Sequence, residues 1–148
     1  LKVIDGNIIC SFIAGSNITG IIQPTYDIAK LVHKYKGLIF FDYAGCAPYI
    51  KIDMNKDNES FYDAIYISPH KFVGGASTPG LLVAKEHLFR NEMPFCPGGG
   101  TVRFVCEKYK IYSNDVETKE TGGTPNVLGS IRTGLVFQLK DRNIDKII

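Results

Sequence analysis

The chain has 148 residues, of which 45% are hydrophobic and 22% are charged, which is the composition of a globular protein with one core. Its 17 basic and 15 acidic residues are mixed along the sequence and leave a net charge of +2, so no basic stripe for nucleic acid is present. No apolar run approaches the roughly 18 residues of a membrane-spanning helix, and no signal peptide is visible.

Strand-like and helix-like patterns alternate from the start of the chain. Asn7–Ala14 is an apolar, β-branched run that predicts a buried strand, and Leu38–Tyr43 is a continuously apolar run that predicts a parallel strand buried on both faces. Between them we predict a helix from Tyr26 to Tyr35 with Thr25 as its N-cap and an end at Gly37. The apolar face of this helix would comprise Ile28, Leu31, Val32 and Tyr35.

Two more strands are predicted in the middle of the chain. They are Ala64–Ser68 and Gly80–Ala84, with a polar loop over 56–60 before them and a short helix around Glu86–Arg90 after them. Strands joined by a helical crossover predict an α/β fold with a mostly parallel sheet and flanking helices.

The last third of the chain is predicted to be less regular at first and then helical. Short strands are expected at Thr101–Val105 and Tyr109–Tyr112, after the proline- and glycine-rich loop Pro94–Gly100. Beyond the loop Glu120–Thr124, Pro125 would open a helix running to about residue 140. Its expected core face comprises Val127, Leu128, Ile131, Leu135 and Leu139.

The cysteines and the chain ends bear on the setting of the protein. Cys10, Cys46, Cys96 and Cys106 form no C-x-x-C pair and no zinc-like cluster, so we interpret them as small hydrophobes in a reducing cytoplasm. The first residue is Leu1, and we interpret residues 1–148 as one segment of a longer protein, although a trimmed mature chain would look the same. We expect His33 and His87 to face solvent.

The tetrapeptide Ser68-Pro69-His70-Lys71 is the first candidate for chemistry, because it follows a predicted strand. A lysine desolvated in a tight, glycine-flanked turn is suited to form an imine with an aldehyde cofactor. Ser68 and His70 would supply hydrogen-bond donors for a phosphate. The alternative is a surface lysine in a polar turn.

Asp42 is the second candidate, since a carboxylate at the end of a buried apolar run needs a compensating partner. A protonated pyridine nitrogen would be such a partner, and the resulting cationic ring would act as an electron sink. Capping of the loop that follows is the other reading, and the sequence leaves both open.

The third candidate is the stretch Gly122–Asn126 at the start of the last predicted helix. Its free N–H groups and the Thr124 hydroxyl could bind an anion, or Thr124 could simply cap the helix. The loop Gly98–Gly100 could also approach an anion, but neither stretch matches a nucleotide-binding fingerprint.

Five features follow one another in an order typical of a known family. They are Asn17 in Ser-Asn-x-Thr-Gly, Asp42 after an apolar strand, Ser68-x-His70-Lys71, the Gly98–Gly100 loop and Gly123-Thr124-Pro125-Asn126. This order resembles the class V aminotransferase family, which includes the cysteine desulfurases and selenocysteine lyases. The resemblance extends from about Ile9 to Leu139.

The resemblance implies part of the large domain of a fold-type I enzyme dependent on pyridoxal 5'-phosphate (PLP), with a seven-stranded, mostly parallel sheet. It implies that Lys71 binds the cofactor as a Schiff base and then shuttles protons. Asp42 would pair with the pyridine nitrogen, and Asn17 would contact the cofactor on the side of its ring oxygen.

The same resemblance implies a phosphate site and a homodimer. Ser68 and His70 would bind the cofactor phosphate, and Thr124 would reach the phosphate in the neighbouring subunit. An N-terminal part and a small C-terminal domain of the family would lie outside residues 1–148, so we expect the isolated segment to bind PLP weakly and to be poorly active.

The chain departs from the desulfurase pattern at two positions. Gly45 stands where desulfurases carry a glutamine, and Tyr49 stands where many members carry a histidine. The desulfurase nucleophile belongs to a later region, so Cys46 is not expected to be it. The sequence therefore predicts a PLP enzyme that acts on an amino acid by aminotransferase or lyase chemistry. Cysteine desulfuration and a non-catalytic scaffold remain the alternatives.

Overall fold

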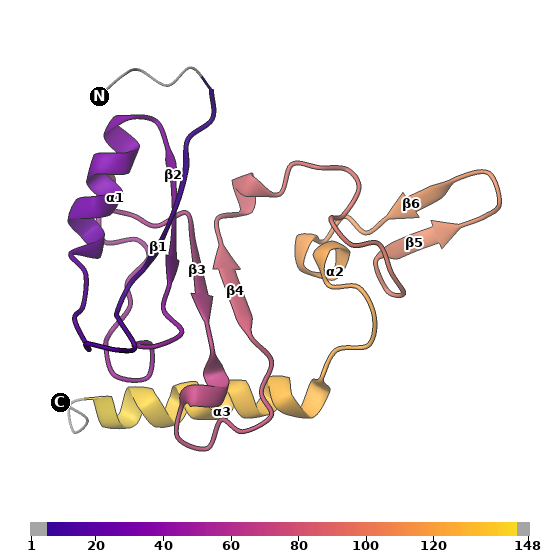
Figure 1. The fold of residues 1–148 in the computed structure, drawn as a ribbon. Coiled ribbons are helices and arrows are strands. Elements are labelled where there is room, and N and C mark those ends of the chain that lie inside the picture. Colours follow the sequence, from indigo (N-terminus) through magenta and orange to yellow (C-terminus); the bar gives the residue numbers. More distant parts are fainter. Residues whose placement is uncertain (1–5, 145–148) are drawn as a thin grey trace.

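The computed structural model describes residues 6–144, which form a four-stranded sheet, a separate two-stranded hairpin and several helices. In chain order the sheet region comprises β1 (Ile9–Ile13), α1 (Thr25–Lys34), β2 (Leu38–Asp42), β3 (Ala64–Ile67) and β4 (Leu81–Ala84). The strands β1, β2 and β3 are parallel neighbours, and β4 runs antiparallel to β3 (Figure 1). The predicted mixed fold with a mostly parallel sheet is therefore confirmed.

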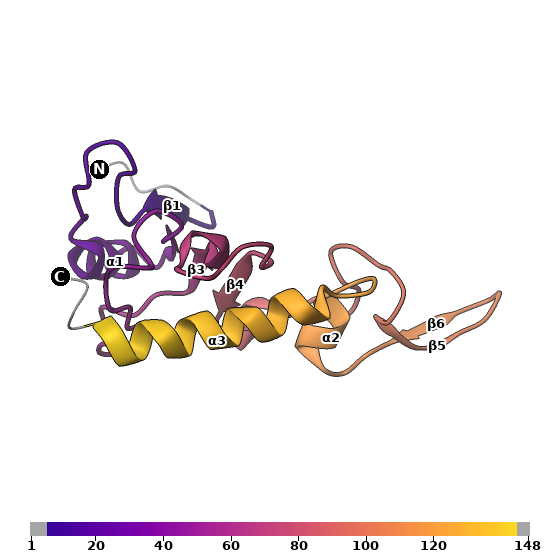
Figure 2. The same cartoon turned by 90° about the horizontal axis from the view of Figure 1, so that it is seen from below.

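Short helices and a hairpin connect the sheet to a long helix near the end of the described chain. These elements are η1 (Pro69–Lys71), η2 (Glu86–Leu88), β5 (Val102–Val105), β6 (Lys110–Tyr112), α2 (Val116–Glu120) and α3 (Val127–Asn143). The sequence did not predict η1 or α2, because neither has room for an apolar period. The hairpin β5–β6 extends away from the sheet (Figure 2).

The core lies between α1 and the face of the sheet that α1 covers. Ile39 and Phe41 on β2 are fully buried there, and Phe41 packs edge-on against Tyr62 with ring centroids 4.8 Å apart. Thr25 was predicted to cap α1, but Pro24 occupies the N-cap position. The Thr25 hydroxyl instead forms a buried hydrogen bond of 2.7 Å with the Tyr62 hydroxyl.

The opposite face of the sheet is largely exposed within the described residues. Ile13, Asp42 and Tyr66 are register partners on neighbouring strands, so their side chains share this face. Ile13 is 43% exposed and Tyr66 is 39% exposed, and β1 as a whole has no buried residue. The prediction that residues 38–43 are buried on both faces is wrong for the described chain, because β2 is fully buried on the α1 face but only half-buried on the other.

The long helix α3 lies across the carboxyl ends of the parallel strands (Figures 1 and 2). Its predicted core face is wrong: Val127, Leu128, Ile131, Leu135 and Leu139 are all at least 46% exposed. The buried residues are Gly129, Thr133 and Val136. None of the helices described in residues 6–144 is long and apolar enough to cross a membrane.

Candidate active site

Polar side chains follow each of the three parallel strands at the edge where these strands end. Asp42 is the last residue of β2, Asn17 lies in the turn after β1, and the turn Ser68–Lys71 follows β3. The register puts Asp42 level with Ile13 on β1 and with Tyr66 on β3. Because the carboxyl ends of parallel strands meet at one edge, these predicted site residues lie at the same edge of the sheet (Figure 1).

The turn after β1 touches the turn after β2. The N–H of Ala14 donates to the carbonyl oxygen of Asp42 at 2.8 Å. A Cβ built at Gly45 would lie 3.3 Å from the carbonyl oxygen of Gly15 and 3.8 Å from the Cβ of Asn17. A side chain at position 45 would therefore push the two turns apart, and glycine at this position lets them stay in contact.

Asp42 is half-buried and uses one carboxylate oxygen within its own loop. Its Oδ1 accepts a hydrogen bond of 2.7 Å from the N–H of Ala44, which is the loop-capping role that the sequence left open. Its Oδ2 makes no hydrogen bond to any residue of the described range 6–144. One oxygen therefore fixes the carboxylate, and the other can accept a proton-bearing partner.

The Lys71 turn is fixed by its backbone and by the residue that follows it. The N–H groups of Lys71 and Phe72 donate to the carbonyl oxygens of Ser68 and Pro69, both at 3.0 Å. The Phe72 side chain is buried and packs on Phe137 of α3, with ring centroids 4.8 Å apart. A Cβ at Gly75 would collide with the carbonyl oxygen of Pro69, so this close packing requires glycine.

The side chains of this turn are more exposed than expected. Lys71 and His70 are exposed and Ser68 is half-buried. The apolar, desolvated surroundings predicted for the Lys71 amine are therefore not supplied by the described residues. In the part of the chain that the structure describes, the three side chains form no hydrogen bond with one another or with other residues.

The two glycine-rich stretches predicted as anion sites pack against each other. The N–H of Gly123 donates to the carbonyl oxygen of Gly99 at 2.8 Å, and a Cβ at Gly98 would lie 3.4 Å from the Cα of Gly122. Thr124 follows this junction and is exposed. Within residues 6–144 no hydrogen bond joins Thr124 to Asp42 or Lys71, so a role for Thr124 at the cofactor stays a prediction.

Comparison with known proteins identifies the family. The sequence model of the family described as aminotransferase class-V matches residues 3–147, which is nearly the whole chain. The chain belongs to the aminotransferase class-V family. It is 32% identical over 133 residues to a probable cysteine desulfurase of Halalkalibacterium halodurans, and 31% identical to one of Halobacterium salinarum. The alignment covers 89% of this chain but only about a third of each relative, 32% and 31% respectively.

Solved structures of the family share the fold. The cysteine desulfurase CsdA of Escherichia coli superposes with a TM-score of 0.77 at 24% identity, over 89% of this chain and 32% of that one. The apo cysteine desulfurase of Thermococcus onnurineus superposes with a TM-score of 0.79 at 22% identity, over 92% of this chain and 33% of that one. Both matches establish the class-V fold for this chain.

Cys46 is unsuited to act as a nucleophile in this class-V chain. Its thiol is buried, and a Cβ built at Gly15 would lie 3.0 Å from its Sγ. Burial raises the pKa of the Cys46 thiol, and the nearby Asp42 carboxylate raises it further. Because the thiolate is the reactive form, this environment suppresses its reactivity. The thiol therefore serves as packing between the turns after β1 and β2.

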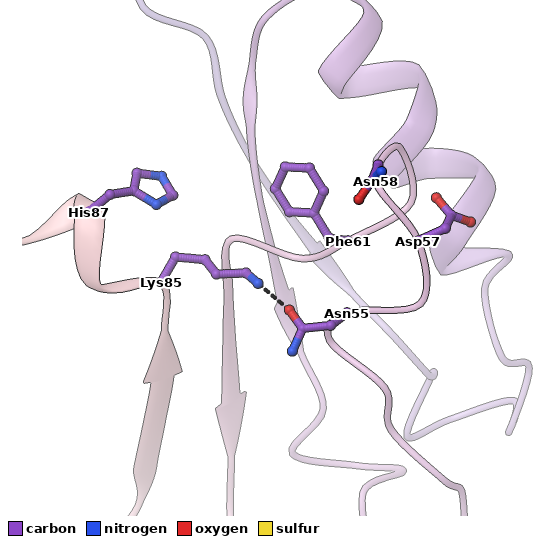
Figure 3. A pocket seen from close by; sticks show the side chains of 6 residues that line it. All are labelled: Asn55, Asp57, Asn58, Phe61, Lys85 and His87. Carbon is purple, nitrogen blue, oxygen red and sulfur yellow. Dashed lines mark hydrogen bonds between the residues drawn. The ribbon is translucent and has the colours of Figure 1, made fainter.

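A pocket of about 350 Å³ lies near the start of β3, away from the strand ends that form the candidate active site. It is lined by Asn55, Asp57, Asn58, Phe61, Lys85 and His87 (Figure 3). Lys85 follows β4, which runs antiparallel to β3, so the pocket opens where β3 begins rather than where it ends. Lys85 donates to the side chain of Asn55, and its Nζ lies 5.5 Å from the centre of the Phe61 ring.

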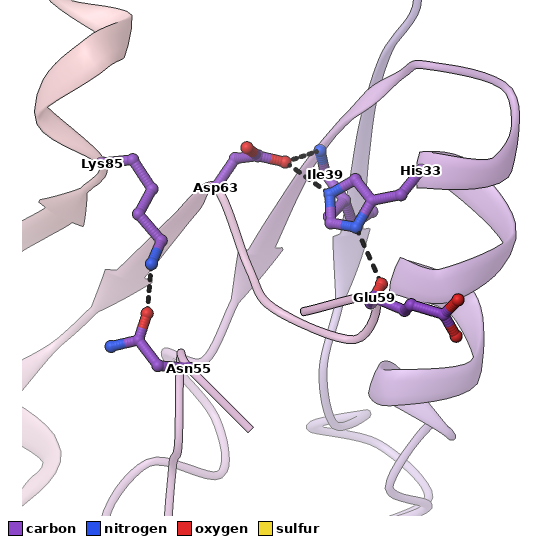
Figure 4. Close-up of polar contacts among 6 residues, drawn as sticks. All are labelled: His33, Ile39, Asn55, Glu59, Asp63 and Lys85. Atoms are coloured by element: carbon purple, nitrogen blue, oxygen red, sulfur yellow. Dashed lines mark hydrogen bonds and ion pairs between the residues drawn. The ribbon is translucent and has the colours of Figure 1, made fainter. Parts of the chain in front are cut away.

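His33 does not simply face solvent as predicted. Its side chain is 15% exposed, and its Nε2 lies 3.0 Å from Oδ2 of the buried Asp63 (Figure 4). Its Nδ1 lies 3.0 Å from the carbonyl oxygen of Glu59. The ring therefore lies between the Asp63 carboxylate on one side and a backbone carbonyl oxygen on the other. The His33 ring thus ties α1 to the loop before β3.

Sequence reasoning missed a set of donors on α3 that reach the site loops. Asn126 and Arg132 donate to the carbonyl oxygens of Ser77 and Ala76, in the loop after Lys71. Lys140 donates to two carbonyl oxygens in the loop after Asp42. No group of three or more residues suited to hold a metal ion occurs in the described part of the chain.

Proposed function

We propose that this chain is part of a PLP-dependent enzyme that acts on an amino acid, with Lys71 as the residue that holds the cofactor covalently. The observation that supports the proposal is the placement of Asp42 and the Ser68–Lys71 turn at the ends of two adjacent parallel strands. Asp42 is level with Tyr66 on β3, and η1 begins three residues beyond Tyr66. A planar ring between the two turns could contact both side chains.

The residues at this edge fit the groups of the cofactor. The exposed Lys71 amine is free to react with an aldehyde, and Oδ2 of Asp42 is free to accept a proton-bearing ring nitrogen. Ser68 and His70 supply a hydroxyl and a ring N–H for a phosphate, and Asn17 offers an amide to the ring oxygen. When bound, PLP supplies an electron sink for the loss of a substituent from the α-carbon of an amino acid.

Each residue then has a separate task. Asp42 holds a proton on the ring nitrogen, because a carboxylate favours the cationic form of a base in contact with it. The Lys71 amine takes a proton from the substrate α-carbon and returns it, as an amine freed beside that carbon can do. Gly75 allows the close packing that fixes the backbone from which this amine extends.

The proposed enzyme is a homodimer and is longer than 148 residues. The chain spans about a third of the length of the curated relatives that it matches, 32% in the first of them. Thr124 is exposed and makes no described contact with its own Asp42 or Lys71, so in our proposal it reaches the cofactor phosphate of a second copy. We place the cofactor site in the large domain of each subunit.

Cysteine desulfuration is the second candidate function. Two relatives, 32% and 31% identical to this chain, are named probable cysteine desulfurases, and these names favour it. The absence of a glutamine side chain at Gly45 weighs against it, and Cys46 is too well buried to serve as the nucleophile. A desulfurase of this family would need a reactive cysteine in the part of the protein outside this chain.

The proposal is tested in the full-length protein by its visible absorbance and by borohydride reduction followed by peptide mass analysis. We expect a visible band that disappears on reduction, with the cofactor mass fixed to Lys71. Lys71→Ala should abolish the band and turnover, whereas Lys108→Ala, an exposed lysine in the hairpin, should change neither. A normal band in Lys71→Ala, or cofactor mass on another lysine, would refute the assignment.

The reaction type is read from the products. Incubation with L-cysteine that yields alanine together with a persulfide on an enzyme cysteine, or with sulfide once an added thiol reduces that persulfide, would identify desulfuration. Formation of a 2-oxo acid from the amino-acid donor would identify transamination. A protein that shows neither product and no cofactor band would be a non-catalytic relative.

A further inference from the structure

The loop that follows Asp42 presents carbonyl oxygens toward α3. Residues 43–50 form two successive turns, with N–H bonds from Ala47 to the carbonyl of Tyr43 and from Tyr49 to the carbonyl of Cys46. The carbonyl oxygens of Ala47 and Ile50 accept no backbone N–H within the described residues. They need donors from elsewhere, because both oxygens lie in a part-buried position.

Lys140 supplies both donors. Its Nζ lies 2.6 Å from the carbonyl oxygen of Ala47 and 2.6 Å from that of Ile50. The same ammonium lies 5.7 Å from the centre of the Phe72 ring. Burial lowers the pKa of the Lys140 amine, which agrees with an ammonium enclosed between these groups. One side chain thus contacts the loop after Asp42 and the residue next to Lys71.

We propose that Lys140 is a positioning residue that sets the Asp42 loop against the Lys71 turn. Phe72 is anchored on α3 through Phe137, so α3 carries the Lys71 turn, and Lys140 joins the Asp42 loop to that same helix. Loss of the ammonium would leave two carbonyl oxygens without donors and would free residues 44–50 to move. The consequence for the cofactor rests on the function proposed above, whereas the effect on the loop does not.

Two variants on the same helix separate positioning from general stability. Lys140→Met keeps most of the side-chain length but removes every donor, and Lys140→Arg keeps a charged donor. Arg142→Met removes a charge from an exposed position of α3 and is the matched control. All variants are made in the full-length protein.

The first measurement is hydrogen exchange of the protein without cofactor. In Lys140→Met we expect the amides of residues 44–50 to exchange roughly tenfold faster or more, because two charge-assisted hydrogen bonds are lost. Exchange in α1 and β1 should not change, and Lys140→Arg should restore much of the protection. Unchanged exchange in residues 44–50, or equally faster exchange throughout the protein, would overturn the proposal.

The second measurement is the visible absorbance of the cofactor-loaded protein as a function of pH. If Lys140 positions Asp42, Lys140→Met should shift the pH at which the band titrates, and Arg142→Met should not. Faster loop exchange with an unshifted titration would overturn the positioning role. A wild-type protein with no visible band would instead refute the proposed function. In that case hydrogen exchange would still test whether Lys140 stabilises residues 44–50.

Discussion

The hydrogen bond between His33 and the buried Asp63 carboxylate allows a quantitative prediction. Asp63 is 2% exposed, and its Oδ2 accepts hydrogen bonds from His33 Nε2 at 3.0 Å and from the N–H of Ile39 at 2.9 Å (Figure 4). Removing one partner of a buried pair costs about 3–5 kcal/mol, because the other partner stays buried without compensation. We expect a loss of that size in Asp63→Ala, which strands both His33 and the Ile39 N–H.

A double-mutant cycle isolates the pair itself. A buried charge-assisted hydrogen bond contributes about 2 kcal/mol, so the coupling between His33→Ala and Asp63→Ala should be near that value. Stacking of His33 on Phe61, with ring centroids 4.0 Å apart, does not involve Asp63 and therefore cancels in the cycle. The assay is hydrogen exchange of the β2 amides, where this coupling corresponds to a factor of roughly thirty in rate.

The exposed pair of Lys30 and Glu59 is the matched control. It joins the same helix to the same loop at 2.6 Å, but its side chains are 62% and 68% exposed. Water and salt screen such a pair, so its coupling should be much weaker. Equal coupling in the two cycles, or a coupling for His33 and Asp63 below about threefold in rate, would refute the argument from burial.

Three further predictions follow from glycine and cysteine environments. Gly75→Ala should abolish covalent cofactor binding in the absorbance assay, because the new Cβ collides with the Pro69 carbonyl. The control Gly99→Ala should keep cofactor binding, because its new Cβ meets nothing within 4 Å. Iodoacetamide should label Cys96 far faster than Cys46 at pH 8, since burial raises the pKa of the Cys46 thiol; equal labelling by mass analysis would contradict this. Gly134→Ala, also free of contacts, should stabilise α3 by about 0.5–1 kcal/mol in urea unfolding.

Much of the fold could be predicted from the sequence, because its elements have simple periods. The apolar run over residues 38–43 and the runs at 64–68 and 80–84 became β2, β3 and β4, each with one boundary shifted by one residue. The edge where the parallel strands end also followed from the βαβ order. The burial of the strands was less predictable. A continuous apolar run does not show whether residues of the described range cover the second face of the strand.

The site residues could be named from the sequence, but their surroundings could not. Asp42 was expected either to face a ring nitrogen or to cap its loop. Its Oδ1 caps the loop, whereas its Oδ2 makes no hydrogen bond within the described residues. Lys71 was expected in an apolar turn, yet it is exposed, because the turn buries Phe72 in its place. The histidine at position 33 was misjudged because its partner Asp63 lies thirty residues away in the chain.

The error on α3 has a physical cause that bears on the site. The prediction assumed that a helix turns its apolar stripe inward, which holds when the helix meets apolar side chains. At the carboxyl edge of the sheet, α3 packs Phe137 on Phe72 and also meets loops whose carbonyl oxygens need donors. Asn126, Arg132 and Lys140 donate to the carbonyl oxygens of these loops, whereas the buried Thr133 hydroxyl bonds to the carbonyl oxygen of Gly129 within the helix. The donors at both ends of α3 are therefore the feature that fits this helix to hold the two site loops together.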